Sequence, residues 1–163
     1  VDCITTAVFG VSRGGYVPAG QPHSLSFATG IPVPVGKDPR LHLDISLRYR
    51  VLRDEGAHEL WKVQVVGYIY TVRDHTYAPL LAFHWHPHGG SRVNWPHLHI
   101  YEPALRPASL LAKAHIPTGP IAVEDVIRLL IAEFGVGPRR GHGDWDSVLA
   151  QGRRELEQQQ TWA

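Results

Sequence analysis

Apolar and polar residues alternate strictly along residues 41–51, which predicts a strand with one buried side and one solvent-facing side. Residues 59–73 begin with the same alternation and end apolar on both sides, as a central strand would. Two shorter alternating runs follow, at 80–86 and 97–101. Because the connections between these four runs are short, we expect them to pair as an antiparallel meander. Residues 110–116 fit either a fifth strand or a helical turn.

A different period appears after the strands. Apolar residues recur at helical spacing from Val123 to Phe134, which predicts an amphipathic helix that ends at Gly135. A second, more polar helix is predicted to begin at Asp144 or Asp146 and to run to about residue 160. The predicted fold is therefore α+β: an antiparallel four- to five-stranded meander sheet with two helices packed mainly on one face.

Residues 1–40 are rich in glycine and proline and hold only short apolar pieces. We expect an irregular N-terminal arm over residues 1–40 and a single α+β domain over residues 41–160. The length of 163 residues is enough for one hydrophobic core.

Charge and cysteine content narrow the class of protein. The formal net charge is +1 with neutral histidines, so no strong overall attraction to nucleic acid or to an anionic membrane is expected. The lone cysteine, Cys3, excludes an intrachain disulfide and a cysteine-based zinc site. No apolar stretch approaches the roughly 18 residues of a membrane span, and no signal peptide pattern opens the chain. We expect a cytoplasmic protein that does not act on a membrane.

The most unusual stretch is residues 81–101, which hold five of the eleven histidines. Successive side chains of a strand point to opposite faces. If the two runs of this stretch pair as a hairpin, four histidines lie together on the face opposite the apolar one: His84, His86, His97 and His99. Cross-strand neighbours are roughly 4.5–5.5 Å apart at Cβ, close enough to share a metal ion, a phosphate or a proton. His88 and His115 are weaker candidates.

Three interpretations of these histidines stay open. Catalytic zinc commonly takes three protein ligands and leaves one position for water, so two H-x-H pairs suit a divalent transition metal such as zinc. Without a metal, a neutral histidine can deprotonate a ribose 2′-hydroxyl while a protonated histidine donates its proton to the leaving oxygen. Arg92, Arg139 or Arg140 would then steady the phosphate. In the third interpretation the histidines are only the polar side of a sheet.

The segment Pro96–His99 and the order of the predicted elements resemble the TumE-like proteins, which are toxins of type II toxin–antitoxin pairs. The resemblance covers residues 41–134 and implies a ribonuclease-like toxin with an antitoxin-like protein partner. Uncharacterised bacterial proteins with an H-x-H-P and P-H-L-H pattern are also similar. The same segment fits the core motif of HUH endonucleases, but those enzymes need a tyrosine on a later helix, and residues 121–134 contain none.

The sequence thus predicts a small phosphodiester hydrolase, with RNA as the expected substrate and His84, His86, His97 and His99 at its centre. The alternative is a non-catalytic metal-binding or interaction module with a His-rich sheet face. Replacement of His97 by alanine is expected to abolish activity and to leave the melting temperature nearly unchanged.

Overall fold

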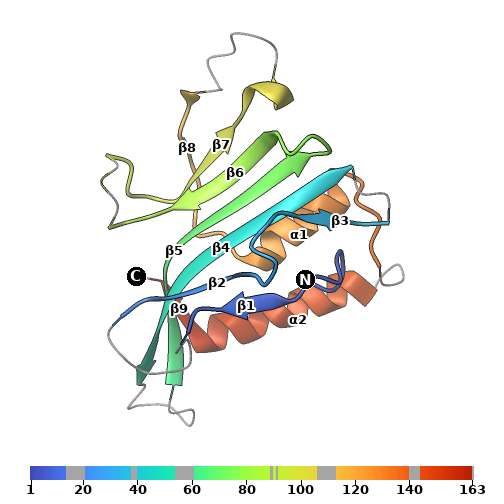
Figure 1. Cartoon of the computed structure of the whole chain (residues 1–163). Helices are drawn as coiled ribbons and strands as arrows, with labels where there is room; N and C mark the ends of the chain where they lie inside the picture. Colours follow the sequence, from blue (N-terminus) through green and yellow to red (C-terminus); the bar gives the residue numbers. More distant parts are fainter. Residues whose placement is uncertain are drawn as a thin grey trace.

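The computed structural model describes residues 1–13, 21–37, 40–53, 61–88, 90, 92–105, 113–139 and 144–162. Nine strands form one sheet: β1 (Phe9–Val11), β2 (His23–Phe27), β3 (Val33–Val35), β4 (Leu41–Arg53), β5 (Trp61–Asp74), β6 (Pro79–Trp85), β7 (His97–Ile100), β8 (Ile116–Pro117) and β9 (Gln160–Trp162). The helices are α1 (Val123–Ala132) and α2 (Asp144–Gln159), with a short 3-10 turn, η1 (Glu102–Ala104). Both long helices lie behind the sheet in Figure 1.

The centre of the sheet is an antiparallel meander in which β4 pairs with β5, β5 with β6 and β6 with β7. The predicted α+β class and the meander are therefore confirmed. The sheet is larger than the predicted four or five strands because β1 to β3, β8 and β9 extend it. β9 is parallel to β5 and lies on the same edge of β5 that β6 occupies further along that strand.

The expectation of an irregular arm is wrong for three pieces of residues 1–40. β2 and β3 both pair with the outer edge of β4, and β1 pairs with β2. An unpaired edge of a long strand offers a row of free N–H and C=O groups, which these short strands satisfy. Residues of this N-terminal part also enter the core, both within these strands and before them: Cys3, Ile4, Phe27, Val33 and Val35.

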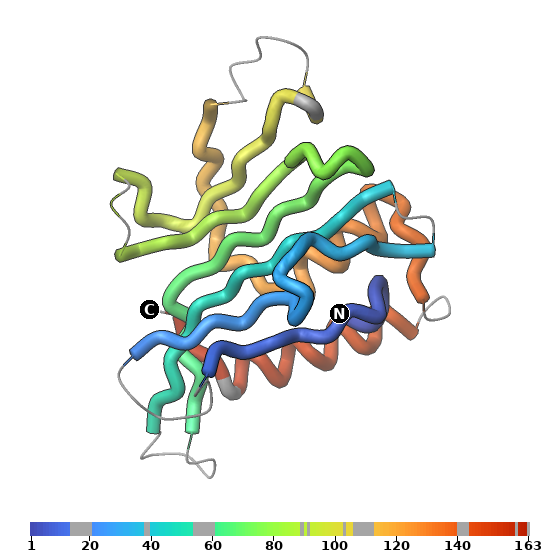
Figure 2. The backbone as a smooth tube through the Cα atoms, in the orientation of Figure 1, coloured from blue at the N-terminus to red at the C-terminus, as the bar shows by residue number. Residues whose placement is uncertain are grey.

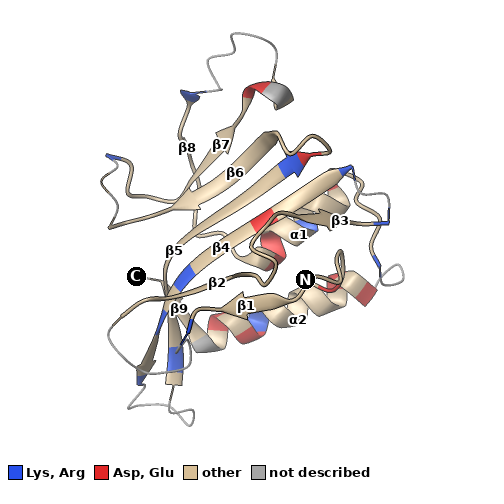
Figure 3. Cartoon of the chain, viewed as in Figure 1, with Lys and Arg blue, Asp and Glu red and all other residues tan. Residues whose placement is uncertain are grey.

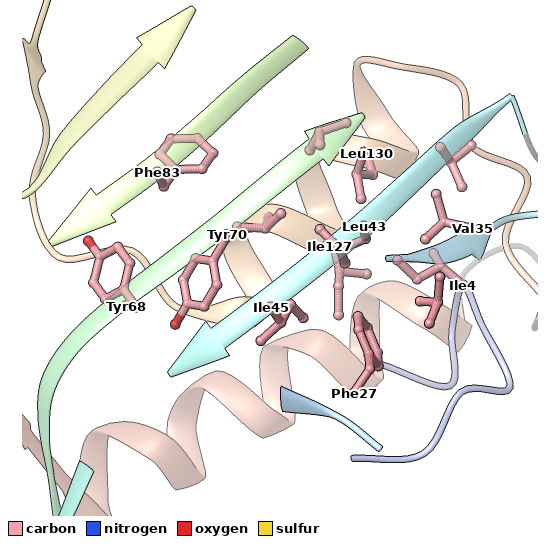
Figure 4. Packing of buried hydrophobic residues seen from close by; sticks show 14 of the residues in the cluster. Ile4, Phe27, Val35, Leu43, Ile45, Tyr68, Tyr70, Phe83, Ile127 and Leu130 are labelled. Atoms are coloured by element: carbon pink, nitrogen blue, oxygen red, sulfur yellow. The ribbon is translucent and has the colours of Figure 1, made fainter. Parts of the chain in front are cut away.

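The core lies between the sheet and α1. Val126, Ile127 and Leu130 of the helix are buried against the inner face of β4 and β5, where Figure 4 shows Leu43, Ile45 and Tyr70 among them. The strand alternation directs these apolar side chains inward and leaves the polar positions of β4 to β7 on the opposite face. We call that opposite face the outer face of the sheet.

Residues 133–139, which follow α1, run along the end of the sheet that is distant from the start of β7, as the tube in Figure 2 shows. In the described residues, no helix is both long and apolar enough to cross a membrane.

Candidate metal centre

The β6–β7 hairpin brings histidines from two strands to the outer face. His84 is directly opposite His97, and Ala82 is opposite His99. The side chains between them, Phe83 among them, point into the core on the other face. The predicted hairpin and the predicted shared face are therefore confirmed for His84, His97 and His99.

These three histidines converge on one point. Their potential ligand nitrogens all lie within 4.8 Å of one another. The ring centroids of His84 and His99 are 4.7 Å apart, and those of His97 and His99 are 4.8 Å apart. The three side chains are thus close enough to hold one metal ion. We call them the histidine trio.

His97 is oriented by the backbone. Its Nδ1 lies 2.8 Å from the carbonyl oxygen of Trp95. A carbonyl only accepts, so Nδ1 carries the proton and donates, and Nε2 keeps its lone pair. Nε2 of His97 faces Nε2 of His99 at 3.1 Å. Metal-binding histidines in proteins commonly donate their second ring N–H to a carbonyl in this way.

The spacing suits tetrahedral coordination. With zinc–nitrogen bonds of about 2.0–2.1 Å, two ligands of a tetrahedron are about 3.3 Å apart. The 3.1 Å separation of the His97 and His99 Nε2 atoms is close to that value. The ligand nitrogens of all three histidines lie within 4.8 Å of one another, so they would have to move closer together to bind an ion. Three nitrogen ligands leave a fourth position for water.

The trio is electrically neutral at neutral pH. Burial and, to a smaller extent, the neighbouring imidazoles of His99 and His97 together lower the pKa of His84 to about 4. Burial also lowers the pKa of His97 and of His99, and nearby histidines add to the effect. A metal binds the neutral imidazole, so a lowered pKa favours metal binding at neutral and mildly acidic pH.

Two further histidines adjoin the trio. The ring of His115 is 4.6 Å from that of His99 and 5.1 Å from that of His97, because β8 pairs with β7 immediately after it. The ring of His86 is 6.0 Å from that of His84 and 5.7 Å from that of His97. We call the trio with His86 and His115 the five-histidine cluster.

Burial of His97 argues against a merely solvent-facing role. His97 is 1% exposed, and Ala82, which is opposite His99 on the same face, is fully buried. A polar side chain that only faced water would not be enclosed in this way. Burial also changes the expected effect of the alanine variant, since removal of His97 would leave a cavity and an unpaired Trp95 carbonyl. We therefore expect that variant to lose stability as well as any function.

The three arginines predicted to contact substrate differ in where the structure places them. Arg92 is exposed in the β6–β7 connection. Arg139 is exposed, and its backbone N–H donates to the carbonyl of Cys3 at 2.7 Å, on the stretch that Figure 2 shows far from the start of β7. Arg140 lies outside the described residues.

Two arginines that the sequence did not single out lie on the outer face instead. Arg48 and Arg50 come from β4 and line a pocket together with His86 and His88. The available signal was their alternation with the buried Tyr49, which places both on the polar side of β4. The alternation within β4 does not indicate the order of the strands, and it is this order that places the polar side of β4 near the histidines.

Comparisons with protein-family models, with curated proteins and with solved structures gave no match to this chain. The resemblance to TumE-like toxins, with its antitoxin-like partner, therefore stays a prediction.

Proposed function

We propose that this protein is a metal-dependent hydrolase that cleaves phosphodiester bonds, with RNA as its substrate and the cytosol as its compartment. The histidine trio would hold a divalent transition metal such as zinc. The single observation that carries the proposal is the convergence of three neutral imidazoles, with ligand nitrogens within 4.8 Å, from two paired strands.

The chemistry follows from the ligand set. A metal held by three histidines lowers the pKa of a bound water to about 7 and so supplies a nucleophile at neutral pH. His84, His97 and His99 would hold the metal, and the Trp95 carbonyl fixes the ring of His97. In hydrolysis an oxygen–phosphorus bond forms, the bond to the leaving oxygen breaks, and that oxygen takes up a proton. His86 stands next to the trio without belonging to it, which supports it as the donor of that proton.

A second candidate is a structural metal site. It is favoured by His115, whose ring lies 4.6 Å from His99. Four protein ligands close a tetrahedron, and closed zinc sites are structural rather than catalytic. In that case removal of the metal would unfold the protein, and no turnover would be observed.

The deciding experiment compares the zinc-loaded protein with its His99→Ala and His115→Gln variants, in both metal content and RNA cleavage. A catalytic trio predicts that His99→Ala loses metal and cleavage, while His115→Gln keeps the metal. A structural site predicts that both variants lose metal and that the wild type never cleaves RNA. A wild-type protein that binds no zinc would overturn both candidates.

A further inference from the structure

A pocket of about 320 Å³ opens on the outer face beside the five-histidine cluster. The arginine, serine and histidine side chains that line it come from two parts of the chain. Arg48, Arg50 and Ser46 belong to β4, and His86 and His88 follow β6. His86 is common to the pocket and to the cluster, so the pocket and the histidine trio are adjacent sites on one surface.

A glycine opens the space between the arginines and the histidines. Arg48 of β4 is opposite Gly67 of β5, and Gly67 lies next to the start of the β6–β7 connection. A Cβ at position 67 would come within 2.9 Å of the Trp85 carbonyl oxygen and 3.8 Å of the His86 Cα. Because Gly67 has no side chain, this position of β5 puts no side chain between Arg48 and His86.

The pocket is basic and lacks acidic partners. No carboxylate is among its lining residues, and in the described part of the chain no ion pair joins Arg48 or Arg50 to an acidic side chain. The Nε of Arg50 is buried without a hydrogen-bond partner, which is uncommon for a buried donor. Figure 3 shows basic positions on the lower part of β4, whereas acidic positions gather mainly on the two helices.

We propose that this pocket binds a phosphate group of the substrate, with the guanidinium groups of Arg48 and Arg50 as its ligands. Guanidinium groups match phosphate geometry with paired N–H donors, and an unpaired arginine at a concave site is suited to that role. The assignment to substrate rests on the proposed hydrolase function, whereas phosphate binding by the pocket does not.

The position of the pocket indicates which phosphate is bound. Arg48 and His86 are two strand spacings apart, which is about 9–10 Å across the sheet. The anchored phosphate is therefore a neighbour of the scissile one, and the substrate carries several phosphates along a chain. The pocket thus favours an oligonucleotide over a single phosphodiester such as a dinucleotide.

The test uses full-length protein stripped of metal, so that no cleavage occurs, and a fluorescein-labelled RNA pentamer whose Kd is measured at several salt concentrations. Arg48 is exposed, so Arg48→Gln is expected to fold normally. It should weaken binding by about tenfold, the loss of one charge-assisted contact. It should also reduce the slope of log Kd against log salt by about 0.7. Arg48→Lys should retain most of the salt slope.

The matched control is Arg154→Gln, which removes the same charge from an exposed position of α2 and should bind within about twofold of wild type. Three results would overturn the proposal: no pentamer binding by the wild type, wild-type affinity in Arg48→Gln, or an equal loss in Arg154→Gln.

Cleavage by the zinc-loaded protein separates this proposal from the proposed function. Binding that depends on Arg48 without any cleavage keeps the phosphate pocket and rejects the hydrolase. Cleavage by a protein whose RNA binding does not depend on Arg48 keeps the hydrolase and rejects the phosphate pocket. If both hold, Arg48→Gln raises KM for the pentamer and leaves KM for a dinucleotide unchanged. An equal rise for both substrates would contradict a flanking phosphate.

Discussion

The Nε2 atoms of His97 and His99 lie 3.1 Å apart although both side chains leave the same strand, two residues from each other. Residues at such positions are about 6.6–6.8 Å apart along a strand, so the two rings lean toward one another. His97 is held in this orientation by the Trp95 carbonyl. With Nδ1 of His97 protonated, its Nε2 has a lone pair aimed at a position that His99 also reaches. A shared cation satisfies both rings at once.

We predict that the wild-type protein binds about one zinc ion per chain and that His99→Ala loses it. The variant removes one of three ligands, so the affinity should fall by more than the roughly 10–100-fold that is typical for loss of an outer-shell partner. Competition with a chromogenic chelator measures the affinity directly. His99 is only half-buried, which makes it a better choice than the buried His97.

His75→Ala is the matched control, because His75 is an exposed histidine in the β5–β6 turn. It should bind zinc as the wild type does. If His75→Ala and His99→Ala lost zinc equally, binding would not be specific to the trio.

A second prediction concerns the stability of the metal-free protein at low pH. The pKa of His84 is lowered from 6.5 to about 4 by burial and by its histidine neighbours. Between these two values the unfolded chain binds the proton and the folded protein does not. Stability therefore falls as the pH is lowered from about 6.5 to about 4 and levels off below that range. Urea unfolding of chelator-treated protein at a series of pH values measures the effect.

The matching variant is His84→Gln, which removes the titrating group and keeps a polar side chain. Its unfolding midpoint should depend less steeply on pH between about 4 and 6.5 than that of the wild type. An identical slope in both proteins would show that His84 is not the group responsible. Zinc should stabilise the wild type, and this protection should weaken toward the acidic end of the range because protons compete with the metal for the same nitrogens.

The central strands could be predicted from sequence because they are long enough to show their period. β4 spans 13 residues, enough to show its alternation, and β5 spans 14, enough to show an alternating start followed by the apolar run of a central strand. β1 and β3 have three residues each, which is too short to show a period of two. Their strand structure arises from pairing with neighbours, a tertiary effect that local patterns do not record.

The candidate site also has a part that could be predicted from the sequence and a part that could not. The trio could be predicted because H-x-H in two adjoining strands fixes a shared face once the strands pair. His115 reaches His99 only through the pairing of β8 with β7, and Arg48 reaches the pocket only across Gly67 of β5. Arg139 was predicted to contact substrate by charge alone, and nothing in the sequence indicates that its loop packs beside Cys3.

A third prediction tests the close approach at Gly67. An added Cβ would lie 2.9 Å from the Trp85 carbonyl oxygen, a backbone atom that cannot turn away. Gly67→Ala should therefore destabilise the protein by about 1–3 kcal/mol, as overpacked positions do. Gly119→Ala is the control, because a Cβ there meets nothing within 4 Å. Comparable melting temperatures for the two variants would contradict the close approach.

The last prediction concerns the contact between the two helices. The carboxylate of Asp125 accepts the backbone N–H of Ala122 at the start of α1 and also pairs with Arg153 of α2, both at 2.8 Å. The ion pair is about one third exposed on each side, so Arg153→Ala should cost at most about 1 kcal/mol. Asp125→Ala should cost more, about 1–2 kcal/mol, because it also leaves the N–H at the helix start without its partner.

Urea unfolding of the two variants and of the double variant measures this asymmetry. We expect the double variant to be less stable than Asp125→Ala by only about 0.3–0.5 kcal/mol, because the Asp125–Arg153 pair is already lost and only the exposed Arg153–Glu157 pair is left to lose. Equal costs for the two single variants would mean that the bond to Ala122 adds nothing. In that case α1 would be fixed in place by the burial of Val126, Ile127 and Leu130 alone.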